Sequence, residues 1–436
     1  MKSVSSLWAV ADPALAARIE LAHQAAIKDA LAFIEAHALY SRTGTNGVRQ
    51  VDVQGLLATA FTHRDSRAGD PDLHTHVAVA NKVQTAEGKW LSIDGRVLYK
   101  AVVAASETYN TSLERHLTRD LGVRFAERAN PDPRKRPVRE IVGVDPRLNE
   151  RWSARRASIQ TRRAELAREF QTTHGRPPSP VESIKLAQQA TLETRDAKHE
   201  PRTLQEQRVL WRGQAREVLG SDDAIRSMVA RSVGTAAAGA PVRVSHKWIL
   251  ETSRDIRDAM QSRRSTWQTW HVRAEALRRV RALDGLAPEQ VETVVQRLTK
   301  RVLERDSIRL TPDHDPVSEP AALTRADGQS VYTVHGSAHY TSTDVLAAEQ
   351  RIVAAGGLNR GRSIDAAHVD LALLESTANG VTLNAGQSSL VREMATSPAC
   401  VQLAIAPAGA GKTTAMRALS TAWTNGRGTV LGLAPS

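Results

Sequence analysis

The sequence predicts an α+β domain with an antiparallel sheet and helices, then a mostly helical middle region, then part of an α/β domain. Three observations lead to this fold class. Helical periodicity dominates residues 12–38, 95–121 and 145–310. Short β-prone runs separated by turn residues lie between the first two helices. Near the C-terminus an apolar run, a glycine-rich loop and a helix follow one another. We therefore expect three domains, at residues 1–129, 130–334 and 335–436.

Charge and composition narrow the class of protein. The 436 residues suffice for two or three domains, and 59 Lys and Arg against 47 Asp and Glu give a net charge of +12. This balance favours a polyanionic partner, nucleic acid first, although a general basic bias explains it equally well. Cys400 is the only cysteine, which excludes an intrachain disulfide and favours a reducing compartment. The sequence has no apolar run near the ~20 residues that span a membrane and no signal-peptide pattern, so we expect a cytoplasmic protein without membrane contact.

The first elements follow from local signals. Residues 3–10 alternate loosely, which predicts a strand. Asp12 and Pro13 then start a helix as N-cap and first-turn residue, and apolar positions recur at helical spacing to about Ala38. Asn46-Gly47 is a hairpin signal, and residues 48–53 are expected to form the following strand.

Three histidines form the most informative group. His74 and His76 are two residues apart before a β-prone run, and side chains at i and i+2 of a strand share one face. His63 ends another short apolar run, and the polar stretch around Asp70-Pro71 indicates a loop between two antiparallel strands. That hairpin would bring three imidazoles to one face. Three neutral imidazoles suit a divalent cation with positions left open for a substrate.

The middle of the chain is predicted to be helical. A helix from about Gly95 is expected to end at Leu121, because Gly122 follows. The basic, proline-rich segment 130–137 is expected to be a linker, either merely solvated or in contact with DNA phosphates. Further helices are expected at 150–173, after Ser179-Pro180, from a capping box at Thr203 to Gly220, and within 245–283. The last region carries Trp248, Trp267 and Trp270 among many arginines. These rings can stack on single-stranded bases, but core positions with the arginines facing solvent are the favoured interpretation.

A phosphate-binding loop is predicted near the C-terminus. The apolar run 401–406 is expected to be a buried strand before a glycine-rich turn and a helix. Small residues let backbone N–H groups surround a β-phosphate at the helix N-terminus. Lys412 is expected to reach the β- and γ-phosphates and Thr413 to hold Mg²⁺, which makes ATP with Mg²⁺ the expected ligand. The loop consists of Ala406, Pro407, Ala408, Gly409, Ala410, Gly411, Lys412 and Thr413, with Ala406 where glycine is usual. Helices at 343–355 and 388–395 and a second parallel strand at 430–434 complete this region.

The histidine stretch resembles the three-histidine signature of the TrwC-type conjugative relaxases (MobF class), which are histidine-hydrophobic-histidine endonucleases. The residues that carry the resemblance are His63, Ser66, Arg67, Asp70, Pro71, Leu73, His74, Thr75, His76 and Asn81. Thr75 replaces the usual aliphatic residue and is expected to point away from the metal. The last block resembles the start of the superfamily 1 helicase domain that follows the nuclease in the same relaxases. Tyr340–Ser342, Gln387 and Ala434–Ser436 carry this second resemblance, and Gln387 resembles the helicase glutamine that contacts adenine.

The resemblance implies a function in plasmid mobilisation. In this family a tyrosine near the N-terminus attacks a DNA phosphate at a transfer origin, while a metal at the histidines polarises that phosphate. It implies Mg²⁺ or Mn²⁺ at His63, His74 and His76, and a DNA contact by Arg67. Single-stranded DNA, relaxosome proteins and a type IV secretion coupling protein are the implied partners.

The resemblance also leads us to expect that this chain is a fragment, inactive alone. The family's tyrosine and its Asp base precede the stretch that looks like Lys2–Ser5, and the acidic motif and second motor lobe follow the phosphate loop. We expect packing or surface roles for the tyrosines present, and neither nicking nor unwinding. Two other interpretations stay open. One is a non-catalytic DNA-binding or transfer-signal module, and the other is a nucleotidase or metallohydrolase that uses the histidines without DNA.

Overall fold

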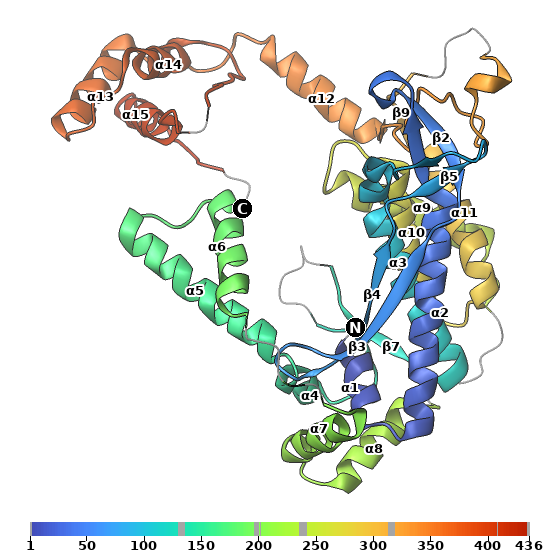
Figure 1. Cartoon of the computed structure of the whole chain (residues 1–436). Coiled ribbons are helices and arrows are strands. Elements are labelled where there is room, and N and C mark those ends of the chain that lie inside the picture. Colours follow the sequence, from blue (N-terminus) through green and yellow to red (C-terminus); the bar gives the residue numbers. More distant parts are fainter. Residues whose placement is uncertain are drawn as a thin grey trace. The chain divides into compact units, whose positions relative to one another are not determined.

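A computed structural model of the whole chain describes residues 2–129, 136–195, 200, 202–234, 242–312, 319–407 and 409–433 (Figure 1). The chain divides into two compact units, Met1–Tyr340 and Thr341–Ser436. Most of the predicted linker 130–137, the loop residue Ala408 and the stretch Ala434–Ser436 lie outside the described residues. The predicted boundaries after residues 129 and 334 stay predictions.

The first element is a helix, α1 (Lys2–Val10), so the predicted strand at 3–10 is wrong. All of its residues from Ser3 to Val10 are buried, and a helix buried on every side shows no one-faced periodicity. Its serines bond to neighbouring elements instead of to solvent. Ser3 Oγ accepts from the Ile141 amide at 3.0 Å, and Ser5 Oγ accepts from the Leu73 amide at 3.2 Å. The helix thereby supports the strand that carries two of the histidines.

Two long helices confirm the predicted start and stop signals. Asp12 caps α2 (Pro13–His37) by accepting from the Leu15 amide at 2.9 Å. The second, α3 (Gly95–Leu121), ends at Gly122, whose φ of +63° is the left-handed conformation that glycine adopts without strain. The two helices pack along each other in the first unit (Figure 1).

The strands lie between these helices in two antiparallel groups. A four-stranded sheet has the order β1-β2-β5-β6, from β1 (Tyr40–Thr43), β2 (Arg49–Gln54), β5 (Val83–Thr85) and β6 (Trp90–Leu91). The predicted turn at Asn46-Gly47 joins β1 to β2, and both residues have positive φ. Among the described strands, β3 (Ala58–Asp65) and β4 (Pro71–Val79) pair only with each other, as one long ribbon (Figure 1). The histidines therefore lie on the predicted hairpin.

The next elements surround the loop of that hairpin. A short pair, β7 (Phe125–Glu127) and β8 (Arg139–Ile141), leads to α4 (Pro146–Arg151) and α5 (Ala154–His174). The predicted single helix at 150–173 is thus divided between α4 and α5. Trp152 lies at the break, where its ring is buried and its Nε1 donates to Gln214 at 2.8 Å. The helices α6 (Pro180–Glu193) and α7 (Leu204–Leu219) begin with the predicted caps, and α8 (Asp222–Ser232) follows.

Three more helices complete the first unit. They are α9 (His246–Gln261), α10 (Thr269–Arg281) and α11 (Pro288–Glu304). Trp267 and Trp270 are buried and Trp248 is half-buried, which confirms the core interpretation, but Arg273, Arg278 and Arg281 of α10 do not face solvent as expected. Short segments follow, namely β9 (Ile308–Arg309), a 3₁₀ turn (Ala321–Leu323) and β10 (Tyr340–Thr341), which pairs with β9.

A buried ion-pair network joins α10 to α3. Glu107 accepts from Arg278 at 2.7 Å and from Arg281 at 2.8 Å, and Glu114 accepts from Arg139 at 2.9 Å. Every one of these side chains is at most 12% exposed. Because an unpaired buried charge is costly, the carboxylates explain why arginines are tolerated on the inner face of α10.

The second unit contains α12 (Thr343–Gly356), α13 (Ala366–Ala378), α14 (Ala385–Thr396) and α15 (Lys412–Asn425). Helix α12 was predicted, and α14 begins three residues earlier than predicted because Asn384 and Gln387 form a capping box. Valine and alanine side chains of α13, α14 and α15 form its core, together with Ile364 before α13 and Leu383 before α14. In the described part of the chain, no helix is long and apolar enough to cross a membrane.

Both predicted strands of the second unit are wrong for the residues described. Residues 401–407 and 429–433 have no strand assignment, and Leu403 and Ile405 are 84% and 95% exposed. A parallel strand requires a neighbour on its hydrogen-bonding edge, and neither stretch has one among the described residues. The α+β class of the first unit and the helix after the glycine loop are confirmed, and no parallel sheet forms among the residues that the structure describes.

Candidate metal centre

The hairpin sorts its side chains onto two faces. His63 is the cross-strand partner of His74, and Phe61 is the partner of His76. Because side chains alternate along a strand, these four share one face, while Thr62 and its partner Thr75 share the other. His63, His76 and Phe61 are exposed and His74 is half-buried, so the histidine face is open to a large ligand.

The spacing of the three imidazoles fits a shared metal ion. Ring centres are 5.3 Å apart for His63 and His74, 4.9 Å for His63 and His76, and 5.0 Å for His74 and His76. A metal about 2.1 Å from one nitrogen of each ring lies about 3.2 Å from each ring centre, so ligand angles of about 90–110° separate the centres by about 4.5–5.2 Å. The observed separations agree with this range.

The donor atoms are less well placed than the ring centres. Within the described ranges, no group of three or more His, Cys, Asp or Glu side chains has its donor atoms already positioned for a metal ion. Histidine χ2 is a soft torsion, and exposed or half-buried rings can turn about it at small cost. The centre of each imidazole lies close to its χ2 axis, so rotation about χ2 can turn the nitrogens toward a common point without changing the ring separations.

His74 is oriented by its neighbour. Its Nδ1 is 2.7 Å from the Asp72 carbonyl oxygen and 3.6 Å from Asp72 Oδ2. A histidine that donates one N–H to an oxygen acceptor keeps its other nitrogen, Nε2, as a lone-pair donor for a metal. Asp72 therefore acts on the site through His74.

The other signature residues hold the hairpin loop in place. Ser66 Oγ accepts from the amides of Ala68 and Asp70, both at 3.3 Å. Asp70 is buried, which raises the pKa of its carboxyl, and its Oδ2 accepts from the Ala154 amide at the start of α5 at 2.9 Å. Ser66 and Asp70 of the signature thus stabilise the hairpin loop.

Helix α7 clamps the same loop. Trp211 is fully buried and donates from Nε1 to the Gly69 carbonyl at 2.9 Å, and Gln207 donates to Asp65 Oδ2 at 2.9 Å. The ring of Trp211 packs against Trp8 of α1 at 5.4 Å. Arg67, the predicted DNA contact, lies half-buried in this clamped loop.

The face opposite the histidines is hydrogen-bonded to α2 and α3. Thr75 Oγ1 lies 3.1 Å from Thr62 Oγ1 and 2.9 Å from His23 Nε2. His23 Nδ1 lies 2.7 Å from the hydroxyl of Tyr109, which α3 supplies. Burial lowers the pKa of His23 and raises the pKa of Tyr109 to about 12. Thr75 thus points away from the histidine face, as predicted.

The tyrosine placements agree with packing roles for Tyr40 and Tyr109. The Tyr40 ring stacks on His335 at 4.9 Å, and burial raises its pKa to about 12. The hydroxyl of Tyr109 is bonded to His23 on the face of β4 opposite the metal ligands. Neither hydroxyl is prepared for nucleophilic attack.

The second candidate site is the glycine loop. Gly411, with φ +74°, precedes α15, and Gln387 Nε2 donates to the Ala410 carbonyl at 2.9 Å. Lys412 Nζ donates to the Ala406 and Pro407 carbonyls at 2.8 and 2.7 Å. The structure therefore places Gln387 beside the loop that contains Lys412. However, Gln387 Oε1 also accepts from the backbone N–H of Asn384 at 3.0 Å, so its observed role is that of a cap.

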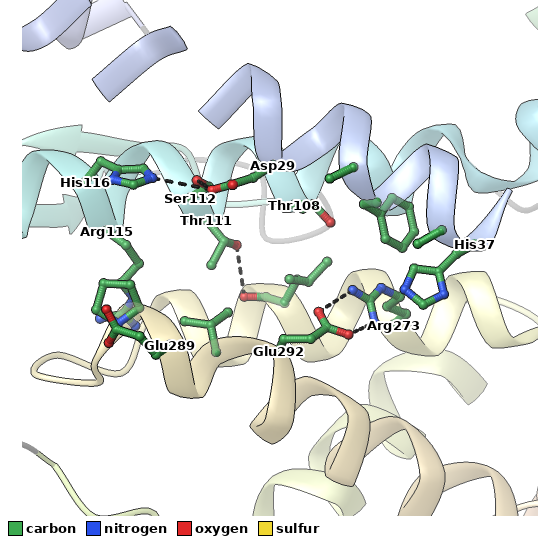
Figure 2. Close-up of a pocket in the computed structure, with 16 residues that line it drawn as sticks. Asp29, His37, Thr108, Thr111, Ser112, Arg115, His116, Arg273, Glu289 and Glu292 are labelled. Carbon is green, nitrogen blue, oxygen red and sulfur yellow. Dashed lines mark hydrogen bonds and ion pairs between the residues drawn. The ribbon is translucent and has the colours of Figure 1, made fainter. Parts of the chain in front are cut away.

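A cavity of 440 Å³ lies in the first unit, between α2, α3, α10 and α11 (Figure 2). Phe33, Leu277 and Val291 contribute apolar walls, and Arg273 is paired to Glu292 at 2.6 Å on its rim. Its lining includes neither the hairpin histidines nor the glycine loop.

Sequence reasoning missed His23, Tyr109 and Asp72. His23 was detectable in principle, because it is a polar residue beside the buried positions Ile19, Ala22 and Ala26 of α2. The partners of such a residue lie far along the chain, and a single sequence does not identify them.

The chain matches two family descriptions. The TrwC relaxase model matches residues 1–218, and the AAA domain model matches residues 382–436. No match was found among curated proteins.

Among solved structures, the chain is similar to complexes of the conjugative relaxase TrwC with oriT DNA. The copper-bound complex is 26% identical over 51% of this chain and 69% of that chain, with a TM-score of 0.41. A complex with a 27-mer DNA that comprises the recognition hairpin and cleavage site is 26% identical over 51% and 71%, with a TM-score of 0.40.

Proposed function

The chain belongs to the TrwC relaxase family, and from this premise we propose that His63, His74 and His76 hold a divalent metal, Mg²⁺ or Mn²⁺, for DNA cleavage at a transfer origin. One observation carries the proposal. Three imidazoles converge on the open face of the hairpin, with ring centres 4.9–5.3 Å apart, inside the region that the family model matches. The hairpin loop is held by α5 and α7, and Phe61, His63 and His76 are exposed, so this face is available to a substrate.

Each residue of the proposed metal centre has its own role in DNA cleavage. A bound divalent cation would supply Lewis-acid polarisation of a phosphate oxygen. His74 keeps Nε2 for the metal because Asp72 accepts at Nδ1, and Phe61 presents an aromatic face that is 53% exposed beside His76. Arg67 is proposed as a phosphate contact from the loop. The attacking tyrosine is not assigned to Tyr40, whose ring stacks on His335, or to Tyr109, whose hydroxyl is bonded to His23.

We further propose that the second unit binds ATP with Mg²⁺. Lys412 would exchange the carbonyls of Ala406 and Pro407 for phosphate oxygens, and Thr413 would contribute a hydroxyl to Mg²⁺. The AAA domain match over this segment supports the assignment. The loop is proposed to consist of residues 406–413, with Gln387 beside it.

A fluorescent ATP analogue should bind to the chain, and Lys412→Ala should weaken that binding. Unchanged binding would contradict the proposal.

Single-stranded origin DNA is the proposed substrate, with relaxosome proteins and a type IV secretion coupling protein as proposed partners. The net charge of +12 supports a polyanion, and phosphate contacts make affinity fall steeply with salt. A binding curve that is insensitive to salt would contradict this part of the proposal.

Titration calorimetry with Mn²⁺ tests the metal centre. The wild-type chain should show one saturable site that His74→Ala/His76→Ala removes. The control is His174→Ala/His246→Ala, which deletes two histidines outside the hairpin and should leave the isotherm unchanged. Equal Mn²⁺ binding by both double variants would overturn the proposed centre.

A denaturing gel with an origin oligonucleotide and Mn²⁺ addresses catalysis by the chain alone. We expect no covalent adduct from the packed tyrosines. A shifted band that survives denaturation would instead identify a tyrosine nucleophile among the five, and Tyr40→Phe would be the first variant to examine.

A further inference from the structure

The metal-binding face lies on a ribbon that needs support from outside. Among the described strands, β3 and β4 pair only with each other. Two-stranded ribbons twist more than larger sheets and are marginally stable alone. Rotation of β4 about its own axis would swing His74 and His76 together and would change the angle at which both rings meet a ligand.

Thr75 is placed to resist that rotation. It lies between His74 and His76 with its side chain on the opposite face, so any turn of the strand displaces all three side chains at once. Its hydroxyl is bonded to Thr62 on β3 and to His23 on α2, at 3.1 and 2.9 Å.

His23 extends the connection to a third element. Its ring is 5% exposed, lies edge-on to Tyr109 at 5.8 Å between ring centres, and bonds the Tyr109 hydroxyl at 2.7 Å. The row Thr62–Thr75–His23–Tyr109 therefore links β3, β4, α2 and α3 through side chains alone.

The hydrogen bonds of the row depend on one another. A neutral imidazole has one donor and one acceptor nitrogen, whereas each hydroxyl can donate and accept. All three hydrogen bonds are satisfied together when the hydrogens run in one direction along the row, from either end. Removing the hydroxyl of Thr75 or Tyr109 takes away the row's partner of a ring nitrogen of the buried His23, which costs more than the lost bond itself.

We propose that Thr75, His23 and Tyr109 are positioning residues that set the angle of His74 and His76 toward the metal. The inference rests on the proposed metal centre. It assigns a specific task to the threonine that stands where the family pattern has an apolar residue.

The experiment measures Mn²⁺ affinity by calorimetry and the visible absorption of the Co²⁺-loaded protein. Thr75→Val keeps the shape and removes the hydroxyl, so we expect a Kd about tenfold weaker, as for loss of an outer partner of a metal ligand. The Co²⁺ bands should also shift. Thr75→Ser restores the hydroxyl and should return both readouts toward wild type. Tyr109→Phe breaks the far end of the row and should give a smaller loss in the same direction.

The matched control is Ser41→Ala, which deletes a hydrogen bond from a buried serine to the Ser92 carbonyl at 2.6 Å in the other sheet. It should lower the Tm without changing Mn²⁺ affinity or the Co²⁺ spectrum. If Thr75→Val does not fold, Tyr109→Phe and Thr75→Ser decide the question.

The outcomes separate the two proposals. Wild-type affinity and spectrum in both Thr75→Val and Tyr109→Phe, with binding lost in His74→Ala/His76→Ala, would overturn the positioning role and leave the metal centre intact. Absence of a saturable site in the wild-type chain would overturn both.

Discussion

The loop of the histidine hairpin is held from three sides, whereas the described residues of the glycine loop are bonded by side chains of the second unit. Ser5, Ala154 and Trp211 bond the hairpin or its loop from α1, the start of α5 and α7. At the described part of the glycine loop, the side-chain hydrogen bonds come from Gln387 and from Lys412 of the loop itself. A motif whose geometry depends on distant elements should be sensitive to changes far from it, and a locally held motif should respond only to its neighbours.

Trp211→Ala should give the largest effect and tests the first half of this comparison. Deleting a fully buried indole that contacts Trp8 and bonds Gly69 should cost about 3–5 kcal/mol of unfolding free energy. Hydrogen exchange should rise in residues 58–79 while the second unit keeps its protection. Trp90→Ala, at a ring that is 52% exposed, is the control and should change little. A cost below about 1 kcal/mol would show that α7 does not hold the loop.

Acid should loosen the hairpin through His23. Burial lowers the pKa of His23 from its ordinary 6.5, so the unfolded chain binds the proton more tightly than the folded chain. The stability contributed by this group is present above pH 6.5 and is lost as the pH falls toward the lowered value. His23→Gln should therefore reduce the difference in unfolding free energy between pH 7 and pH 5. If the difference between pH 7 and pH 5 is the same in His23→Gln and in the wild type, His23 does not contribute to the pH dependence of stability.

Asn384→Ala tests the local support of the glycine loop. Asn384 caps α14 by accepting from the Gln387 amide at 2.9 Å, so its loss should cost about 1 kcal/mol. Because Gln387 also bonds Ala410, binding of an ATP analogue should weaken as well. Asp365→Ala removes an equivalent cap from α13 without a link to the loop, and should leave nucleotide binding unchanged. Equal nucleotide affinity in both variants would disprove the coupling.

Ile405→Ser should give the smallest effect. The sequence pattern predicts a buried strand at this position, where a polar substitution would cost several kcal/mol, but Ile405 is 95% exposed. Because the site is exposed, we expect the free energy of unfolding to change by no more than about 0.5 kcal/mol. Thermal unfolding measures this free-energy change, and hydrogen exchange reports on the protection of residues 401–407. A loss of stability above about 2 kcal/mol would indicate that the strand forms in solution.

The errors of sequence reasoning have a common physical origin. Caps and glycine stops placed α2, α3, α6 and α7, because these signals act over a few residues. The hairpin histidines were placed because alternation along a strand is local too. The helix α1 was taken for a strand because its burial on every side comes from contacts with residues such as Leu73 and Ile141. The strand at 401–406 was expected from its composition, but a strand also requires a partner, and composition does not supply one.

The same limit applies to the candidate site. The spacing of His63, His74 and His76 predicted their shared face, and Thr75 was correctly expected on the other. Its bond to His23, 52 residues earlier in the chain, has no local signal.

The ion pairs between Glu107 and the arginines of α10 have a practical consequence. In about 1 M salt the screening length shrinks to about 3 Å, and protein contacts to DNA phosphates on an exposed surface are displaced by competing ions. The side chains of Glu107, Arg278 and Arg281 are only 10–12% exposed, so counterions have little access to them. Concentrated salt should therefore strip nucleic acid that co-purifies with this basic protein and leave α10 docked on α3. The stripped protein can then be returned to low salt for repeated titrations with defined oligonucleotides.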